Sequence, residues 1–113
     1  YTIRNHQEGF VRAWHAHKSE GKFVTVMNGS ALVGVVGIDD WDNPSKNSEV
    51  SRFVLSSDKP SVLVIPSGYA NGMMTLEKDT IIMVFSTFSL EESLNDDIRY
   101  DSRYWDIWET GER

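Results

Sequence analysis

Two histidines stand among several cations near the start of the chain, in the run from Arg12 to Lys18. His15 and His17 are two residues apart, so in a β-strand both side chains point to the same face. Lys22 follows a few residues later. An imidazole exchanges protons near neutral pH, and a fixed cation can stabilise negative charge that develops on a nearby oxygen. This pattern predicts a polar pocket that contains a base and several cations.

Whether Arg12 joins the two histidines depends on the regularity of the strand that carries them. In a regular strand Ala13, His15 and His17 share one face, and Arg12 lies on the other. Arg12 reaches the histidines only if the strand twists or bulges between Arg12 and His15, or if its long side chain curls around an edge.

A Pro-x-Gly turn, Pro66-Ser67-Gly68, stands later in the chain and leads into another predicted strand. Small antiparallel barrels build a polar pocket in this way. Tyr69 and Asn71 follow the turn directly. Both are therefore candidate pocket residues.

The hydrophobic pattern predicts a mostly β chain. Short runs of apolar and β-branched residues, bounded by Gly, Pro, Asn, Asp or Ser, favour a sandwich or barrel over alternating βαβ units. The predicted strands are Val11 to His17, Phe23 to Met27, Ala31 to Ile38, Val50 to Leu55, Ser61 to Ile65, Ala70 to Leu76 and Ile81 to Phe88. One short helix is predicted over Leu90 to Asn95, with Ser89 as its N-cap and Glu92 closing a capping box.

Glycines mark two further features of the predicted strands. Asn28-Gly29 is a typical hairpin turn because both residues tolerate positive φ, so we expect Ala31 to Ile38 to pair with the strand before it. Gly34 and Gly37 interrupt that partner strand, which indicates a bulge or a close backbone approach.

Length and composition bound the function. The 113 residues suffice for a single domain, 1–113. Seventeen Asp and Glu against eleven Lys and Arg give a net charge of -6, which argues against nucleic acid as a partner, although a local basic patch can still bind one diphosphate. The absence of Cys excludes disulfides, a thiolate nucleophile and Cys-based zinc sites. Without a long apolar run or a signal peptide, we expect no membrane association and a cytoplasmic location.

Several segments together resemble the dTDP-4-dehydrorhamnose 3,5-epimerase family. They are Gly9 to His15, Gly21-Lys22, Gly29 and Ile65 to Met73, with a looser similarity at Ile98 to Asp101. The run His15-Ala16-His17-Lys18 more closely resembles the sugar 3,4-ketoisomerases. Both families share the cupin jelly-roll fold and act on a 4-keto-6-deoxyhexose attached to a nucleotide.

The resemblance implies an all-β cupin jelly-roll β-sandwich that binds a nucleotide sugar and isomerises it without a cofactor. In the epimerases the residue matching His15 removes a proton next to the keto group, and the cation matching Lys22 stabilises the enolate. Arg12 matches a diphosphate or sugar contact, for which a guanidinium is well shaped. A ketoisomerase uses paired histidines, which suits His15 together with His17. Tyr69 is a possible replacement proton donor.

Two differences from the epimerases leave a second function open. The position of the family's second pocket histidine is occupied by Asn71. The tyrosine that acts as the family's general acid, near the end of the last long strand, is absent, and the aromatic residues there are Phe85 and Phe88. The alternative is therefore a non-catalytic sugar-binding cupin. The residues predicted to bind the substrate of the isomerase are Arg12, Tyr69 and Asn71.

A metal-dependent cupin is a third possibility, with His15, His17 and Glu20 as ligands. Asn71 occupies the position of a third histidine, and an amide oxygen is a poor substitute for imidazole on a borderline-soft metal. We therefore predict no metal. Small cupins often pair through edge strands, so a homodimer is expected.

The remaining polar and aromatic residues have simpler interpretations. We expect His6 on the surface and Asp96-Asp97 as a solvated loop pair. Trp41, Trp105 and Trp108 are predicted to be packing or interface residues.

Overall fold

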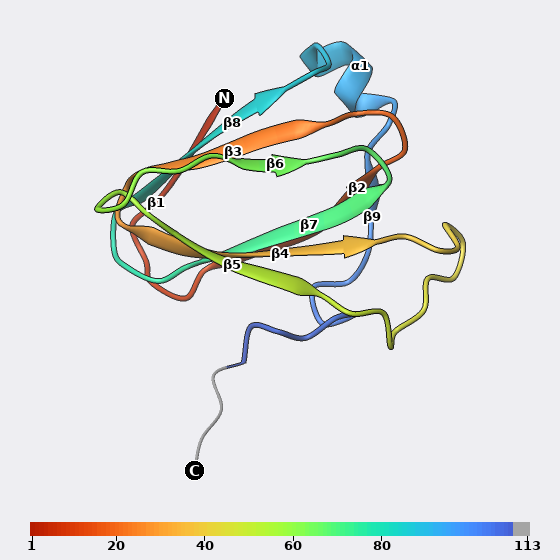
Figure 1. Cartoon of the computed structure of the whole chain (residues 1–113), viewed down its shortest axis with the longest axis horizontal. Helices are drawn as coiled ribbons and strands as arrows, with labels where there is room; N and C mark the ends of the chain where they lie inside the picture. The colour runs from red at the N-terminus through yellow and green to blue at the C-terminus, as the bar shows by residue number, and fades with distance from the viewer. Residues whose placement is uncertain (110–113) are drawn as a thin grey trace.

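The computed structural model describes residues 1–109 and consists of two antiparallel sheets that face each other (Figure 1). Its elements are β1 (Thr2–Asn5), β2 (Val11–His17), β3 (Lys22–Asn28), β4 (Ser30–Gly37), β5 (Ser51–Ser56), β6 (Leu63–Ile65), β7 (Tyr69–Thr75), β8 (Thr80–Ser86), α1 (Leu90–Leu94) and β9 (Ile98–Arg99). One sheet has the order β1-β8-β3-β6 and the other β5-β4-β7-β2-β9. The predicted all-β sandwich is confirmed. The helical segment within 1–109 is too short to cross a membrane.

The predicted strands agree with the observed ones, with ends that shift by one or two residues. Two strands were not predicted, β1 and β9, and both are short. The predicted capping box of α1 is present. The Ser89 hydroxyl accepts a hydrogen bond from the backbone N–H of Glu92 at 3.2 Å, and the Glu92 carboxylate accepts one from the backbone N–H of Ser89 at 2.9 Å.

The predicted hairpin at Asn28-Gly29 is wrong, because β3 and β4 belong to different sheets. Gly29 does have a positive φ of 81°, and a Cβ there would lie 2.5 Å from the Thr80 hydroxyl oxygen. The turn carries the chain from one sheet across to the other. The reason lies in the core, where apolar side chains of β3 and β4 meet between the sheets instead of lying side by side in one sheet.

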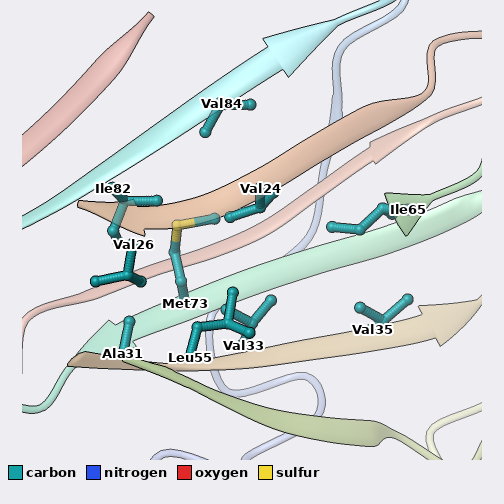
Figure 2. Packing of buried hydrophobic residues seen from close by; sticks show 10 residues of the cluster. All are labelled: Val24, Val26, Ala31, Val33, Val35, Leu55, Ile65, Met73, Ile82 and Val84. Atoms are coloured by element: carbon teal, nitrogen blue, oxygen red, sulfur yellow. The ribbon is translucent and has the colours of Figure 1, made fainter. Parts of the chain in front are cut away.

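The main core fills the space between the two sheets (Figure 2). Its buried members are Val24, Val26, Ala31, Val33, Val35, Leu55, Ile65, Met73, Ile82 and Val84. Because alternate residues of a strand face opposite sides, the residues between these members point outward or toward the ends of the sandwich.

A second apolar cluster lies on the outer face of the five-stranded sheet. There Trp14 is fully buried beneath Trp105 and Trp108 from the C-terminal segment. That segment is tied to β2, because Trp14 and Tyr100 exchange two backbone hydrogen bonds of 3.1 Å. The prediction that Trp105 and Trp108 are packing residues is confirmed, and Trp41 packs partly buried against the same cluster.

Gly34 lies where the aromatic cluster touches the sheet most closely. A Cβ there would lie 2.6 Å from Ile107 Cδ1 and 2.8 Å from the Trp14 ring, so the glycine permits a close approach by side chains. We expect Gly34→Ala to lower the free energy of unfolding by about 1–3 kcal/mol, the usual cost of overpacking. Gly37→Ala is the matched control, since its Cβ would meet only the Tyr69 ring at 3.5 Å. Urea denaturation measures both, and equal losses would contradict the close contact.

Candidate active site

The pairing of β2 with β7 slips between Arg12 and His15. Arg12 lies opposite Met73, whereas His15 lies opposite Asn71. The slip brings Arg12 onto the same side of the sheet as His15. The irregularity between Arg12 and His15 that the prediction required is therefore present. Ala13 instead packs against the outer aromatic cluster, so the expectation that it shares a face with His15 is wrong.

A small polar cavity of about 40 Å³ lies on the inner side of this slip. Its polar lining comprises Arg12, His15, Lys22, Asn71 and Tyr1. A cleft of about 200 Å³ adjoins it and shares all of these residues except Asn71, adding among others His17, Asp97 and Arg99. The structure therefore brings together five of the six predicted site residues, from β2, β3 and β7.

Tyr69 is the predicted site residue that stays apart. It lies at the start of β7 opposite His17, and its ring packs beside Gly37. It is not among the described residues that line the cavity or the adjoining cleft. Tyr1 lines both, although no pattern in the sequence predicts it there. Burial is the main cause that raises the pKa of the Tyr1 phenol, and the carboxylate of Glu20 adds to it. The phenol therefore stays protonated.

His15 is held in a form suited to accept a proton. Burial lowers its pKa from the ordinary value, and the cations Arg99 and Lys22 act in the same direction, while the charge of Asp97 opposes them. His15 Nδ1 lies 3.5 Å from Asp97 Oδ1. That oxygen is buried and makes no hydrogen bond to any described residue, so it is free to accept one from the Nδ1–H. Nε2 is then the basic nitrogen.

Asp97 is thus a site residue, and the prediction of a solvated loop pair is wrong for it. Burial would raise its pKa, but a 2.9 Å hydrogen bond from Arg99 Nε to Oδ2, the charge of Arg99 and the nearby His15 together lower it. Arg99 belongs to β9, which pairs with β2 so that Arg99 lies opposite His15. In the sequence this segment shows only a loose similarity to the epimerase family. Nothing in it predicts which strand β9 pairs with.

Lys22 is a nearly buried cation, with 8% of its surface exposed. Burial lowers its pKa, while the carboxylates of Glu20 and Asp97 oppose that lowering and favour the charged ammonium. An ammonium is a strong stabiliser of negative charge when water is excluded around it. Lys22 is therefore placed to stabilise an oxyanion formed in the cavity.

His17 lies deeper than His15, with 4% of its side chain exposed. Its Nδ1 lies 2.7 Å from the Asp96 carbonyl oxygen, which can only accept, so Nδ1 carries the proton. Nε2 is buried and makes no hydrogen bond to any of residues 1–109. It is therefore the ring nitrogen left without a partner beside the adjoining cleft, which His17 helps to line.

Glu20 and Asp96 hold the surroundings of His17 in place. Glu20 lies 3.2 Å from His17 Nδ1 and accepts hydrogen bonds from the hydroxyls of Ser86 and Ser93. The Asp96 carboxylate accepts from the backbone N–H groups of three successive residues, 18–20. Burial would raise the pKa of Asp96, but these hydrogen bonds lower it. The prediction of a solvated loop carboxylate is therefore wrong for Asp96 also.

The arrangement does not resemble a metal centre. Within 1–109 no three side chains of His, Cys, Asp or Glu are grouped so that they could hold a metal ion. Asn71 Nδ2 donates a 3.3 Å hydrogen bond to the His15 carbonyl, so its amide is turned toward the backbone of β2. His6, as predicted, is exposed, and it pairs with Asp79.

Comparison with known proteins gives one family and several structures. The family model described as dTDP-4-dehydrorhamnose 3,5-epimerase matches residues 2–110. No curated protein matches the sequence significantly.

Solved structures of two kinds share the fold. The dTDP-4-dehydrorhamnose 3,5-epimerase of Bacillus anthracis, with TDP and PPi bound, has a TM-score of 0.70 and 24% identity over 86% of this chain and 55% of its own. The RmlC epimerase of Mycobacterium tuberculosis has a TM-score of 0.78 and 17% identity over 96% and 55%. A double mutant of the QdtA 3,4-ketoisomerase of Thermoanaerobacterium thermosaccharolyticum, in complex with TDP, has a TM-score of 0.69 and 24% identity over 94% and 68%. The chain thus spans little more than half of the two epimerases.

Proposed function

Because this chain belongs to the dTDP-4-dehydrorhamnose 3,5-epimerase family, we propose that it isomerises a nucleotide-linked 4-keto-6-deoxyhexose, as a 3,5-epimerase or a 3,4-ketoisomerase. The observation that carries the proposal is the site, formed by the cavity and the adjoining cleft, that gathers a neutral imidazole, an oriented carboxylate, a buried ammonium and an exposed guanidinium: His15, Asp97, Lys22 and Arg12. The proposed location is the cytoplasm, and no cofactor takes part.

The proposed first step is removal of a proton from the carbon next to the keto group. His15 Nε2 takes the proton, and the C–H electrons form a carbon–carbon double bond while the carbonyl oxygen becomes an enolate oxyanion. Asp97 stabilises the imidazolium that results, because its carboxylate faces Nδ1. Lys22 stabilises the oxyanion, and Arg12 and Arg99 are the cations available for the diphosphate.

The two reactions differ in where the proton returns. An epimerase needs a donor on the opposite side of the ring, and Tyr1, which enters the cavity beside β8, is the proposed donor. A ketoisomerase instead moves a proton between neighbouring carbons on one side. His17 lies on the same strand as His15, and its Nε2 makes no hydrogen bond to any of residues 1–109, which supports that reaction.

One observation favours the second candidate, a non-catalytic nucleotide-sugar binder. Asn71 lines the cavity where the epimerases have a second histidine, and an amide does not exchange protons near neutral pH. In that case the same cations bind the ligand, but no proton leaves it.

Proton NMR of the protein with dTDP-4-keto-6-deoxyglucose in D₂O separates these functions. Loss of the C3 and C5 signals is expected for an epimerase, and loss of the C3 signal with a shifted ketone for a ketoisomerase. Ligand binding with no exchange would favour the non-catalytic binder. Neither binding nor exchange would overturn the proposed substrate.

The pH dependence follows from the environment of His15. Since its pKa lies below 6.5, we expect kcat/KM to fall only as the pH drops below that value, when the base becomes protonated. Asp97→Asn removes a negative charge that favours the imidazolium. It should therefore move the acid limb of the pH profile, the fall of kcat/KM at low pH, to still lower pH. Asp58→Asn, an exposed carboxylate in the β5–β6 connection, should leave the limb unchanged. A limb above 6.5, or an upward shift in Asp97→Asn, would contradict the assignment.

A further inference from the structure

Glu20 is a buried carboxylate that the proposed mechanism does not use. It is 2% exposed, and it lines neither the cavity nor the adjoining cleft. Its side chain lies between three elements. The Ser86 hydroxyl of β8 donates to Oε2, the Ser93 hydroxyl of α1 donates to Oε1 at 2.7 Å, and His17 Nδ1 of β2 lies 3.2 Å from Oε1. Burying a carboxylate is costly unless hydrogen bonds and an opposite charge compensate it.

The two serines supply hydrogen bonds to Glu20 but no opposite charge. No lysine or arginine in the described part of the chain forms an ion pair with it. The basic side chain within ion-pair distance is that of His17. A proton taken up by His17 therefore places positive charge beside the buried carboxylate, which favours the imidazolium.

The two imidazoles of the site have similar surroundings. His15 Nδ1 lies 3.5 Å from Asp97 Oδ1, and His17 Nδ1 lies 3.2 Å from Glu20 Oε1. In each pair the carboxylate faces Nδ1, so Nε2 is the nitrogen that remains for a ligand. A carboxylate placed in this way orients the ring and stabilises the imidazolium that forms when Nε2 takes up a proton.

We propose that Glu20 is a positioning residue for His17, as Asp97 is for His15. Glu20 holds the His17 ring so that Nε2 stays unpartnered beside the cleft, and it stabilises the imidazolium while His17 carries a proton. Ser93 ties this pair to α1, which follows β8 (Figure 1). The inference rests on the proposed function, and it favours the ketoisomerase because it gives the site a second proton carrier on one strand.

The other charged groups near His17 have different partners or lie farther away. The Asp96 carboxylate accepts hydrogen bonds from the backbone N–H groups of residues 18–20, and its carbonyl oxygen is the one that lies 2.7 Å from His17 Nδ1. The remaining titratable and charged side chains of the cleft are Tyr1, Arg12, His15, Lys22, Asp97 and Arg99. Among residues 1–109, none of these forms an ion pair with His17. Removing the charge of Glu20 should therefore affect His17 more than His15.

Glu20→Gln keeps the shape of the side chain and removes its charge. Both serine contacts can persist, because a hydroxyl accepts as well as donates. We expect the ratio of imidazolium to imidazole in His17 to fall about tenfold or more at a pH within its titration, because an opposite charge this close favours the charged form. Nitrogen NMR of the ring measures the ratio without substrate, and His17→Asn identifies the signals.

Glu77→Gln is the matched control for this measurement. Glu77 also accepts a 2.7 Å hydrogen bond from a serine hydroxyl, that of Ser30. It is exposed, however, and lines neither the cavity nor the adjoining cleft. The ratio in His17 should therefore stay as in the unchanged protein.

Glu20→Gln should also lower kcat about tenfold to a hundredfold, the worth of a hydrogen bond to a charged group expressed as a rate. KM for dTDP-4-keto-6-deoxyglucose should change little, since Glu20 does not line the site. Glu20 also favours the charged ammonium of Lys22, against the effect of burial. The double variant with His17→Asn separates the two routes, because Glu20→Gln should cause no further loss once the His17 ring is gone.

Circular dichroism checks that the variants fold. If Glu20→Gln does not, Glu20→Asp replaces it, since its shorter side chain withdraws the carboxylate from Nδ1 and should lower the ratio and kcat by smaller factors. An unchanged ratio, an unchanged kcat or a further loss in the double variant would overturn the role of Glu20. Exchange that still depends on His15 would then leave the proposed function standing. An unchanged protein that binds the nucleotide sugar without exchange would overturn the proposed function, and this inference with it.

Discussion

Replacing His15 with asparagine is expected to slow exchange of the substrate proton by about 10²–10⁴, the usual contribution of a general base. Asparagine keeps a polar group in the cavity but cannot accept a proton near neutral pH. The rate at which the C3 or C5 proton signal disappears in D₂O measures the effect. Binding of TDP, measured by calorimetry, should change little because the cations proposed to contact it remain.

The chain offers controls for this experiment. His6→Asn changes an exposed histidine that pairs with Asp79 and lines neither the cavity nor the adjoining cleft, so exchange should proceed as in the unchanged protein. His17→Asn distinguishes the two reactions. A ketoisomerase that uses paired histidines should lose as much activity as in His15→Asn, whereas an epimerase should lose less. Exchange at the full rate in His15→Asn would rule out His15 as the base.

Trp14→Ala is expected to cost about 3–5 kcal/mol of unfolding free energy, the range for removing a large buried aromatic side chain. Its ring is fully buried, lies edge-on to Trp105 at 5.4 Å and is tilted against Trp108 at 5.2 Å between ring centres. Its indole N–H donates a 3.1 Å hydrogen bond to the Ser102 carbonyl. Urea denaturation followed by far-UV circular dichroism measures the loss.

A loss of this size is a large part of the stability of a small domain. Trp14→Phe, which keeps much of the apolar contact, should retain enough stability to be measured if Trp14→Ala does not fold. Trp41→Ala is the control, because Trp41 is only partly buried at the margin of the same cluster. A smaller loss in Trp14→Ala than in Trp41→Ala would show that the cluster does not hold the C-terminal segment to the sheet.

The local features of the fold could be predicted from the sequence because local interactions determine them. The capping box at Ser89 and Glu92 needs only the chemistry of residues within one turn. The strands themselves follow from short apolar and β-branched runs, as in β3 and β8. His15, Lys22 and Arg12 were identified by type, by spacing and by a family resemblance.

Features that depend on distant partners could not be predicted in the same way. The Asn28-Gly29 turn has hairpin chemistry, but the choice between pairing within a sheet and crossing to the other sheet depends on which arrangement buries β3 and β4 together. No residue near Asp97 in the sequence is a partner for its carboxylate, so the sequence predicts that Asp97 is solvated. Its partner His15 is distant in the chain and comes close only because β9 pairs with β2.

The slip in β2 has a consequence for how this protein can evolve. Arg12, His15 and His17 face the cavity or the adjoining cleft, while Trp14 and Ala16 are buried in the aromatic cluster on the other side. Selection for a new substrate therefore acts on one subset of this seven-residue strand, and selection for a folded chain acts on the other. A lineage can change the inward side chains to fit a different ligand while the outward ones continue to hold the strand in place.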